Sequence, residues 1–402
     1  MKINRAYRRE LKPNVEKRIL CAKHAGTARF AFNWGLKQRI EKYKTTKTST
    51  NAIEQHKLLN SLKIKEFPWM YEVSKCAPQE ALRDLDKAFK NFFRGLKQGK
   101  PIGFPKPKRK GMHDSFRLTG SIKINEKEIQ LPRLGTIRLK EVLNIQGKIL
   151  SATVSREADR WYVSVAVEEE REDPIPLQGQ SVGIDVGLTS FAVLSSGEKI
   201  DAPKPLAKRL RSLKRASKKH SRKVKGSNNR KKSALKLARK HRKIRNVRKD
   251  HLHKLSTELA KTKSEIVIED LNIKGMLRSG KLSRQISDVG WREFRTMLEY
   301  KTKWYGSKLT IAPRSFPSSK RCSGCGTIAE KMPLQIRNWQ CQVCLSNHDR
   351  DINAAKNLLI FSTGSSPGIY ACRDSSGGTG KPPVSYVSLK QELMSETFVH
   401  KL

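Results

Sequence analysis

The stretch SVGIDVGLTSFAVLSSGEKI, residues 181–200, decides the fold that we predict for this chain. It contains a short apolar strand that ends at one carboxylate, Asp185, followed by a turn at Gly187 and a second strand. An aspartate before a turn glycine is also ordinary turn chemistry, so this residue alone means little. Two later stretches, SEIVIEDL at 264–271 and HDRDINAAKN at 348–357, each add a further carboxylate at the end of a strand or the start of a helix.

The three carboxylates have the pattern of a metal site. Glu269 closes the apolar run of one predicted strand, and Asp351 stands just before a predicted helix. Three acids at the ends of strands or helices suit a hard cation such as Mg²⁺, which takes oxygen ligands and keeps several waters. The simpler interpretation of Asp351 is an N-cap of the helix that follows, and the residue could serve both purposes.

The composition points to a polyanionic partner. The chain has 402 residues, enough for two or three domains, and its 84 Lys+Arg against 37 Asp+Glu give a formal net charge of +47. Such an excess repels itself unless a polyanion neutralises it, so we expect nucleic acid. A membrane surface is the alternative, but the sequence shows no amphipathic anchor and no long apolar run, so we expect no membrane partner. The basic start of the chain lacks the apolar segment of a secretory signal, and we expect a cytoplasmic protein.

Cysteine spacing predicts a zinc site. Four of the seven cysteines form two CxxC pairs separated by fifteen residues: Cys322, Cys325, Cys341 and Cys344. Two such knuckles can close a tetrahedron of thiolates around one Zn²⁺. A closed site of this kind is structural, so the zinc should fold a small module and perform no chemistry. We expect His348, close behind the last cysteine, to be a polar loop residue instead of a fifth ligand.

The first half of the chain predicts helices inserted into a β-domain. Residues 1–12 alternate weakly like one strand, and residues 13–98 contain helical patterns. After a Pro/Gly/Lys connector at 99–111 the apolar period changes to two, which indicates several antiparallel strands in a small barrel or sandwich. If the first strand joins them, the helices between are an insertion.

Basic residues on two predicted helical elements are candidates for nucleic-acid contact. In the helix at 76–97 the apolar stripe, including its phenylalanines, is expected to be core, which leaves Lys87, Lys90 and Arg94 off that face. Residues 208–249 contain twenty-one Lys/Arg and no acid, and we interpret the region as an antiparallel helical hairpin with a thin apolar seam. The candidates on this hairpin are Lys214, Lys218, Arg222, Arg239 and Arg242.

The remaining segments are predicted more coarsely. Residues 271–288 are expected to form a polar loop, followed by a helix with an aromatic inner side and a short strand at 308–313. The segment from 363 to 402 is rich in Gly, Ser and Pro, and we expect it to be largely disordered.

Taken together, GIDVG (183–187), IEDL (268–271), CSGCG with CQVC, and DRDINAA (349–355) resemble the TnpB family. These are RNA-guided nucleases encoded by bacterial and archaeal insertion sequences and related to the type V CRISPR effectors. The order of the motifs is also similar: an Asp, a basic hairpin, a Glu, and a zinc ribbon immediately before the last Asp. The resemblance covers about residues 1–360.

The resemblance implies an α/β plus β fold. It comprises a ribonuclease H-like RuvC domain interrupted by a zinc ribbon, preceded by a small β-barrel wedge domain with an inserted helical recognition domain. The expected boundaries are 1–12 and 99–173 for the wedge domain, 13–98 for the recognition domain, 174–313 and 345–362 for the nuclease domain with the hairpin 204–262 inserted, 314–344 for the zinc ribbon, and 363–402 for the tail.

The resemblance also implies partners. A monomer would bind a guide RNA transcribed from the end of its own element and pair that guide with one DNA strand. It would then cleave double-stranded DNA beside a short flanking motif, in the nucleoid of a bacterium or archaeon. Lys75 and Gln79 are candidates for reading that motif.

Our mechanistic hypothesis assigns the carboxylates to two catalytic Mg²⁺ ions. Asp185, Glu269 and Asp351 would hold them, one ion activating water and the other stabilising the leaving 3′ oxygen. The family pattern favours Asp351 over Asp349 and Glu269 over Asp270. Three alternatives stay open: a guide-independent transposase, a catalytically silent RNA-guided repressor, and a basic zinc-ribbon RNA-binding protein.

Overall fold

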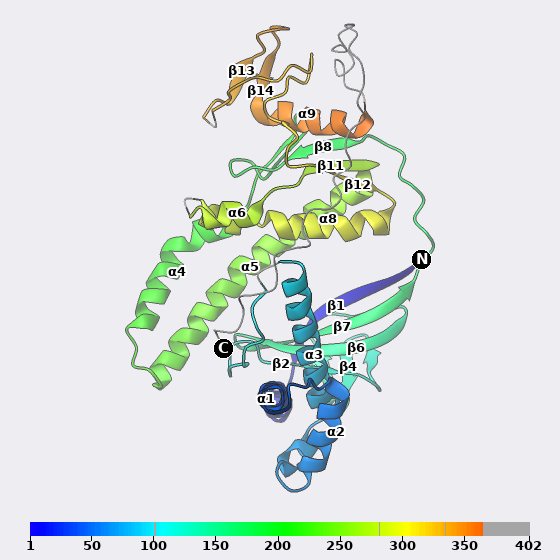
Figure 1. Ribbon diagram of the computed structural model, residues 1–402, viewed down its shortest axis with the longest axis vertical. Coiled ribbons are helices and arrows are strands. Elements are labelled where there is room, and N and C mark those ends of the chain that lie inside the picture. Colours follow the sequence, from blue (N-terminus) through cyan, green and yellow to red (C-terminus); the bar gives the residue numbers. More distant parts are fainter. Residues whose placement is uncertain (100–101, 281, 334, 365–402) are drawn as a thin grey trace.

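The computed structural model describes residues 1–99, 102–280, 282–333 and 335–364, so nearly all of the tail predicted at 363–402 lies outside it. Two large sheets lie in separate halves of the molecule, with helices between them (Figure 1). No helix in the part of the chain that the structure describes is both long and apolar enough to cross a lipid bilayer.

The first sheet has seven antiparallel strands in the order β2-β6-β7-β1-β5-β4-β3. Its strands are β1 (Lys2–Lys12), β2 (Ser115–Leu118), β3 (Lys123–Asn125), β4 (Glu128–Leu131), β5 (Gly135–Leu139), β6 (Lys148–Glu157) and β7 (Arg160–Glu170). Alternate residues are buried along β7, as the period of two predicts. Strand β1 pairs with both β7 and β5, which confirms that the first strand joins this sheet. Among the described strands no ladder joins β3 to β2, so the order is open.

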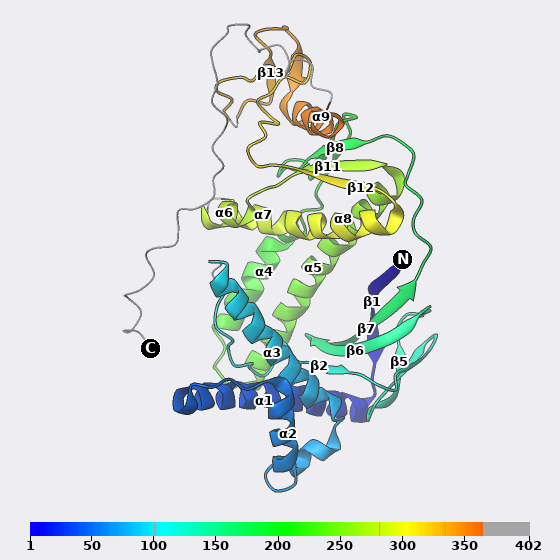
Figure 2. The ribbon, with the colours of Figure 1, turned by 45° about the vertical axis from the view of Figure 1, so that its right-hand side comes forward.

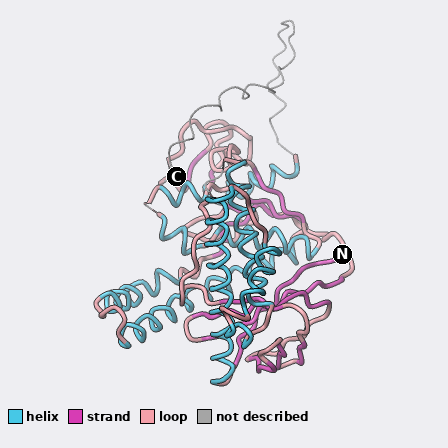
Figure 3. Tube along the Cα trace, turned by 60° about the horizontal axis from the view of Figure 1, so that its bottom comes forward, coloured by secondary structure: helices cyan, strands magenta, loops and turns pink. Residues whose placement is uncertain are grey.

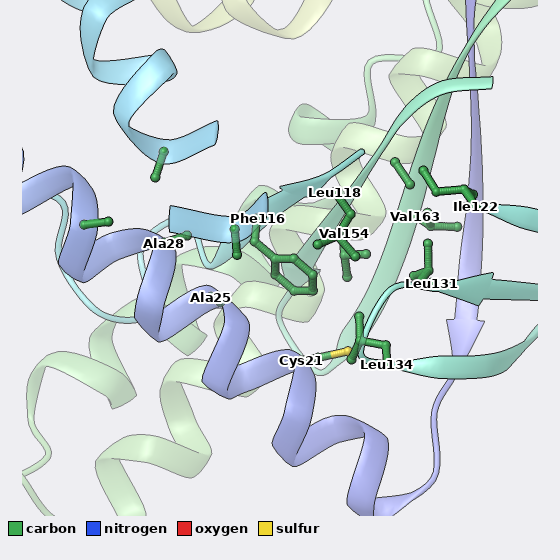
Figure 4. Close-up of a cluster of buried hydrophobic side chains, with 14 of the residues drawn as sticks. Cys21, Ala25, Ala28, Phe116, Leu118, Ile122, Leu131, Leu134, Val154 and Val163 are labelled. Atoms are coloured by element: carbon green, nitrogen blue, oxygen red, sulfur yellow. The ribbon is translucent and has the colours of Figure 1, made fainter. Parts of the chain in front are cut away.

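The helices between β1 and β2 pack on this sheet. They are α1 (Val15–Thr46), α2 (Ala52–Lys63), the 3₁₀ helix η1 (Pro68–Glu72) and α3 (Cys76–Lys97). Helix α2 was not predicted from the sequence. Small residues of α1, including Cys21, Ala25 and Ala28, let the helix approach the sheet residues Phe116 and Val154, and together they form the core in Figure 4.

The apolar stripe of α3 is only partly core. Leu82, Leu85 and Phe89 are buried, as predicted, but Phe93 is 53% exposed and Phe92 half-buried. The prediction that all these phenylalanines are core is therefore wrong for Phe93. Burial stops there because the last turns of α3 extend beyond the helices and strands that cover its first part (Figure 2).

The second sheet has five strands in the order β10-β9-β8-β11-β12. They are β8 (Val182–Asp185), β9 (Ala192–Leu194), β10 (Lys199–Ile200), β11 (Glu265–Glu269) and β12 (Lys308–Ala312). Strands β8, β11 and β12 are parallel, while β9 pairs antiparallel with both β8 and β10. Helix α9 (Arg350–Thr363) covers one face, and α5 (Asn228–Thr262) and α8 (Trp291–Tyr305) cover the other (Figure 1). Burial on both faces explains why these strands are apolar runs.

The predicted basic hairpin is confirmed as α4 (Pro205–Ser221) packed against α5, and it projects from the body of the molecule (Figure 3). The predicted polar loop at 271–288 is wrong, because these residues form α6 (Ile273–Arg278) and α7 (Ser283–Val289). The Asp288 carboxylate accepts the backbone N–H groups of Leu206 and Ala207, at 3.0 and 3.1 Å, and so caps α4. This tertiary contact, with burial of Ile286, gives a polar segment its helical structure.

Candidate active site and zinc centre

Asp185 and Glu269 end neighbouring parallel strands. Ile184 of β8 is in register with Ile268 of β11, so the acid that follows each isoleucine lies at the same edge of the sheet. Neighbouring strands are about 4.8 Å apart, which puts the two carboxylates side by side.

Helix α9 adds the third acid. The helix lies directly on β8 at Gly183, where a Cβ would come within 2.0 Å of the Ala355 carbonyl oxygen. Asp351 precedes Ala355 by one helical turn, about 5.4 Å along the axis. From Gly183 to Asp185 the strand rises by roughly 6.6 Å, a similar distance. The docking of α9 therefore brings Asp351 close to the strand end that carries Asp185.

The electrostatics of the site agree with this geometry. Burial, together with the negative charges of Asp351 and Glu269, raises the pKa of Asp185 to about 7, while Arg350 and Arg337 oppose the shift. No hydrogen bond joins the three carboxylates within the described ranges, so they act on one another through charge. Hard oxygen donors that repel one another in this way fit an oxygen-liganded cation such as Mg²⁺.

The neighbouring acids are engaged elsewhere. Asp349 Oδ1 accepts the N–H groups of Asp351 and Ile352 at 3.0 and 3.1 Å, and its Oδ2 lies 2.7 Å from Lys199 Nζ. Asp349 is thus the N-cap of α9, and the interpretation of Asp351 as the cap is wrong. A cap precedes the first helical residue, which is Arg350, whereas Asp351 is the second residue of α9.

Asp270 is likewise neutralised by arginines. Arg295 and Arg314 both pair with it, the latter at 2.8 Å, and the hydrogen bond from Arg295 is the main cause that lowers the pKa of Asp270. Glu269 instead accepts one hydrogen bond, from Ser318 Oγ at 2.7 Å. The geometry thus leaves Glu269 more available to a cation than Asp270.

Arg337 is a site residue that the sequence analysis missed. Its Nη1 lies 3.1 and 3.3 Å from the two Asp351 oxygens. The arginine directly precedes β13 (Asn338–Gln340), which pairs with β14 (Asn347–Asp349), and the Arg350 N–H donates to the Arg337 carbonyl at 2.7 Å. Arg337 and Asp351 meet only because of the register of this hairpin. In the sequence, a lone arginine between two CxxC pairs carries no signal.

The four predicted cysteines meet in one cluster. Their Sγ atoms all lie within 4.8 Å of one another, with 3.5 Å between Cys322 and Cys344 and 3.6 Å between Cys325 and Cys341. A tetrahedral zinc site with sulfur ligands at about 2.3 Å has sulfur to sulfur edges of roughly 3.8 Å. The Ser346 hydroxyl is the main cause that lowers the pKa of Cys344, to about 6, which favours a thiolate. The cluster therefore fits zinc.

His348 differs from its prediction as a loop residue. It lies on β14, its ring packs 4.9 Å from that of Trp339, and its Nε2 is 3.1 Å from Cys322 Sγ. The imidazole therefore contacts the sulfur of Cys322 from outside the four-sulfur cluster and is not part of that cluster.

Comparison with known proteins places this geometry in a family. A domain model described as "Probable transposase" matches residues 164–280, and one described as "Cas12f1-like, TNB domain" matches 291–358. A third, a "Helix-turn-helix domain", matches residues 1–48, which here form the strand β1 and the single helix α1.

Full-length relatives extend these matches. A Streptomyces pristinaespiralis protein named "Putative RNA-guided DNA endonuclease" is 39% identical over 97% of this chain and 96% of its own length. Escherichia coli InsQ, with the same description, is 32% identical over 89% of this chain and 92% of its own. A TnpB-like protein of Acanthamoeba polyphaga mimivirus is 30% identical over 52% of this chain and 42% of its own. The chain belongs to the TnpB family.

A solved structure shares the fold of this TnpB-family chain. The protein in the cryo-EM structure of a Cas12f1-sgRNA-target DNA complex superposes with a TM-score of 0.50 at 13% identity, over 89% of this chain and 98% of the other. At that identity the likeness concerns the fold alone.

The basic candidates of the TnpB-family chain fall into two groups. One group is exposed, at the start and on the outer side of α3 and on the hairpin: Lys75, Lys87, Lys90, Arg94, Lys214, Lys218 and Arg222, with Gln79 of α3 half-buried. The other group is Arg239 and Arg242 of α5, which pair with Asp159 in the β6–β7 turn at 2.9 and 3.0 Å. Arg242 is only 13% exposed, so this pair holds α5 against the first sheet. Nucleic-acid contact stays a prediction for both groups.

Proposed function

We propose that this chain is an RNA-guided DNA endonuclease that cleaves at a centre formed by Asp185, Glu269 and Asp351. The observation that carries the proposal is the convergence of the three acids: Asp185 and Glu269 end neighbouring parallel strands, and the close contact of α9 with β8 brings Asp351 to the same strand end. Relatives described as RNA-guided DNA endonucleases, alignable over nearly the whole chain, support the same reading.

In this proposal the three carboxylates hold magnesium. When bound there, Mg²⁺ supplies a water activated for attack on the phosphodiester and stabilises the leaving oxygen. The protein's own residues set the geometry: Ser318 orients Glu269, and the Asp349 cap fixes the first turn of α9 that carries Asp351. Arg337 offers a guanidinium beside Asp351, where it can contact a phosphate bound at the centre.

The nucleic-acid partners follow from charge and from the relatives. A guide RNA from the end of the element would provide sequence specificity by base pairing, while lysines and arginines of α3 and of the α4–α5 hairpin hold the backbones. Lys75 and Gln79, at the start of α3, are proposed to read the flanking motif of the DNA. We propose a monomer bound to one RNA.

We also propose the domain division that the resemblance to the TnpB family implies. The seven-stranded sheet corresponds to the wedge domain, α1–α3 to the recognition domain, and the five-stranded sheet with α9 to a RuvC-like nuclease domain. The zinc ribbon connects β12 to α9, and its β13–β14 hairpin carries Arg337 to Asp351. One structural Zn²⁺ would stabilise this connection.

The decisive experiment is purification of the protein from cells that carry its native locus, followed by sequencing of any bound RNA. The complex is then incubated with Mg²⁺ and a DNA library that matches the guide portion. Cutting of duplex DNA beside one short motif supports the proposal. Asp185→Ala should abolish cutting and retain the RNA, whereas Asp201→Ala, an exposed acid on the same domain, should cut normally.

The alternatives give different results in this assay. A catalytically silent guided repressor would bind the matching DNA with its RNA and leave it uncut. A transposase, the activity printed for the family model at 164–280, would join strands at element ends without any guide. Cutting by Asp185→Ala at the rate of the unmodified protein would refute the assignment of the centre.

A further inference from the structure

The carboxyl end of α3 carries an aromatic cluster that the proposed function does not use. Phe89 is buried in the core and contacts the rings of Phe93 and Phe104, and both of these contact Phe92. The ring centroids lie 6.2 Å apart for Phe89 and Phe93, and 5.4 Å apart for both Phe89 and Phe92 with Phe104. This contact network makes the outer rings a rigid surface.

The outer part of the cluster faces solvent. Phe93 is 53% exposed, Leu96 58% and Phe104 45%. The segment that carries Phe104 folds back on α3 because Gly95 leaves room for it: a Cβ there would come within 2.6 Å of Ile102 Cδ1. Large apolar groups held in the open by a rigid base are typical of a binding surface.

The chain segment that carries these rings is strongly basic. Residues 87–113 contain nine Lys/Arg and no Asp or Glu. Lys90 and Lys97 stand three residues before and four after Phe93, so they flank its ring on one face of α3. The nearest acids of this helix, Asp84 and Asp86, are paired with Arg117 and Arg39.

The positive charge beside the exposed rings indicates which kind of molecule binds there. A second copy of this chain would bring the same cationic rim and be repelled, and a basic or neutral peptide would leave the lysines without partners. A nucleic acid satisfies both features, because its phosphates pair with the lysines and its bases offer flat faces to the rings. Paired bases inside a duplex are already stacked, which leaves an unpaired base or the last pair of a duplex.

We propose that Phe93 and Phe104, flanked by Lys90 and Lys97, form a stacking platform for an unpaired or terminal base of a bound nucleic acid. This deepens the proposed function, because it assigns to α3 a base-stacking role besides backbone contact. In Figures 1 and 2 this end of α3 points away from α1, toward the layer of α6 and α8. A strand on the platform therefore lies between the helices on the first sheet and the half that carries the carboxylates.

The test uses the full chain freed of nucleic acid and fluorescence anisotropy with three labelled probes. These are oligouridine and oligothymidine of about 12 nucleotides, within the site size of single-strand binders, and a blunt duplex of the same length. The double variant Phe93→Leu/Phe104→Leu keeps apolar volume and removes the aromatic faces. It should bind at least one unpaired probe about tenfold more weakly, with an unchanged salt slope because the phosphate contacts remain.

Matched variants keep the result interpretable. Phe93→Trp should retain binding because it keeps an aromatic face, and Lys90→Gln should instead reduce the salt slope by about one. Tyr71→Leu, at an aromatic residue of η1 that is 56% exposed, should bind like the unmodified protein. Thermal melting confirms that each variant is folded. The preference between oligouridine and oligothymidine identifies the strand, and preference for the blunt duplex identifies a terminal pair.

Two outcomes would overturn the proposal. One is unchanged binding of all three probes by the folded double variant. The other is a dimer of the free protein, seen by mass photometry and dissociated by Phe93→Leu, which would make the surface a protein interface. Neither outcome depends on DNA cutting, so the platform can fail while the carboxylate centre stands, and loss of cutting in Asp185→Ala tests that centre separately.

Discussion

The carbonyl oxygen of Ala355 lies 2.0 Å from the point where a Cβ on Gly183 would stand, so α9 rests on β8 with no side chain between them. The Leu359 amide nitrogen is the next obstacle, at 2.6 Å. Both are backbone atoms of a regular helix, which cannot rotate away as a side chain can. This single close approach sets the distance between the acid on the helix and the acids on the strands.

Gly183→Ala should therefore damage both stability and catalysis. Pushing α9 off the sheet is expected to lower the free energy of unfolding by about 1–3 kcal/mol and to abolish cleavage, because Asp351 moves with the helix. Urea unfolding and a cleavage assay measure the two effects. The control is Gly26→Ala on α1, where the nearest atom to the new Cβ is 3.9 Å away, and this change should raise stability by up to about 1 kcal/mol. Unimpaired cleavage by Gly183→Ala would contradict the role of the close approach.

The two acids at the start of α9 should respond differently to substitution. Asp351→Asn should abolish cleavage with little change in melting temperature, because Asp351 is not the cap. Asp349→Ala removes the cap and should lower the free energy of unfolding by about 1 kcal/mol, whereas Asp349→Asn retains it. Thermal melts and cleavage rates of the three variants check this. A loss of stability in Asp351→Asn that exceeds that of Asp349→Ala would reverse the assignment.

Stability should depend on pH through Asp185. Its folded pKa of about 7 exceeds the ordinary 3.8, so between these values the native state holds more protons than the unfolded state. The contribution of Asp185 to stability must then fall as pH rises from about 4 to 7, and this decline should be absent in Asp185→Asn. Magnesium competes with the proton and should abolish the difference between the two proteins near pH 7. Melting curves with EDTA and with Mg²⁺ test this, and a constant difference at every pH would contradict it.

The zinc content should follow the cysteine cluster. The purified protein should hold one Zn²⁺ per chain, and Cys341→Ser should lose it, because three thiolates leave the tetrahedron open. Loss of the metal should free the β13–β14 hairpin and make it sensitive to protease, since folding of such modules depends on the ion. Metal analysis and limited proteolysis are the measurements. Cys76→Ser, a thiol outside the cluster, should retain full zinc content.

Substitutions of two basic residues of the hairpin should have different effects, because the two residues have different contacts. Arg242→Gln breaks a partly buried pair with Asp159 and should lower the melting temperature, because it leaves that carboxylate without one of its two arginines. Lys218→Gln, which is exposed on α4, should leave melting unchanged and reduce the salt slope of RNA binding by about one. Melting and salt-dependent binding are measured on both variants. A pure binding effect in Arg242→Gln would place that arginine on the nucleic acid.

Several features of the molecule can be predicted from the sequence because the patterns that indicate them are local. The alternation in β7, the apolar run of β11 and the spacing of the cysteines each lie within a few residues, and the structure contains all three. Other features depend on contacts across the molecule. Asp288 caps α4, which is distant in the chain, and so docks the polar segment that carries it, while Phe93 continues an apolar stripe and yet is exposed.

The candidate site divides in the same way. The sequence by itself determined which acids are available, since strand ends and a helix start are marked by local pattern. Only the tertiary structure decided which of them meet: parallel pairing sets Asp185 beside Glu269, and the absence of a side chain at Gly183 lets α9 bring Asp351 to them. It also gave Asp349 the cap and Arg337 its place beside Asp351. The physical reason is that strand register and helix docking join residues far apart in the chain, and no periodicity within one segment encodes the neighbour it will have.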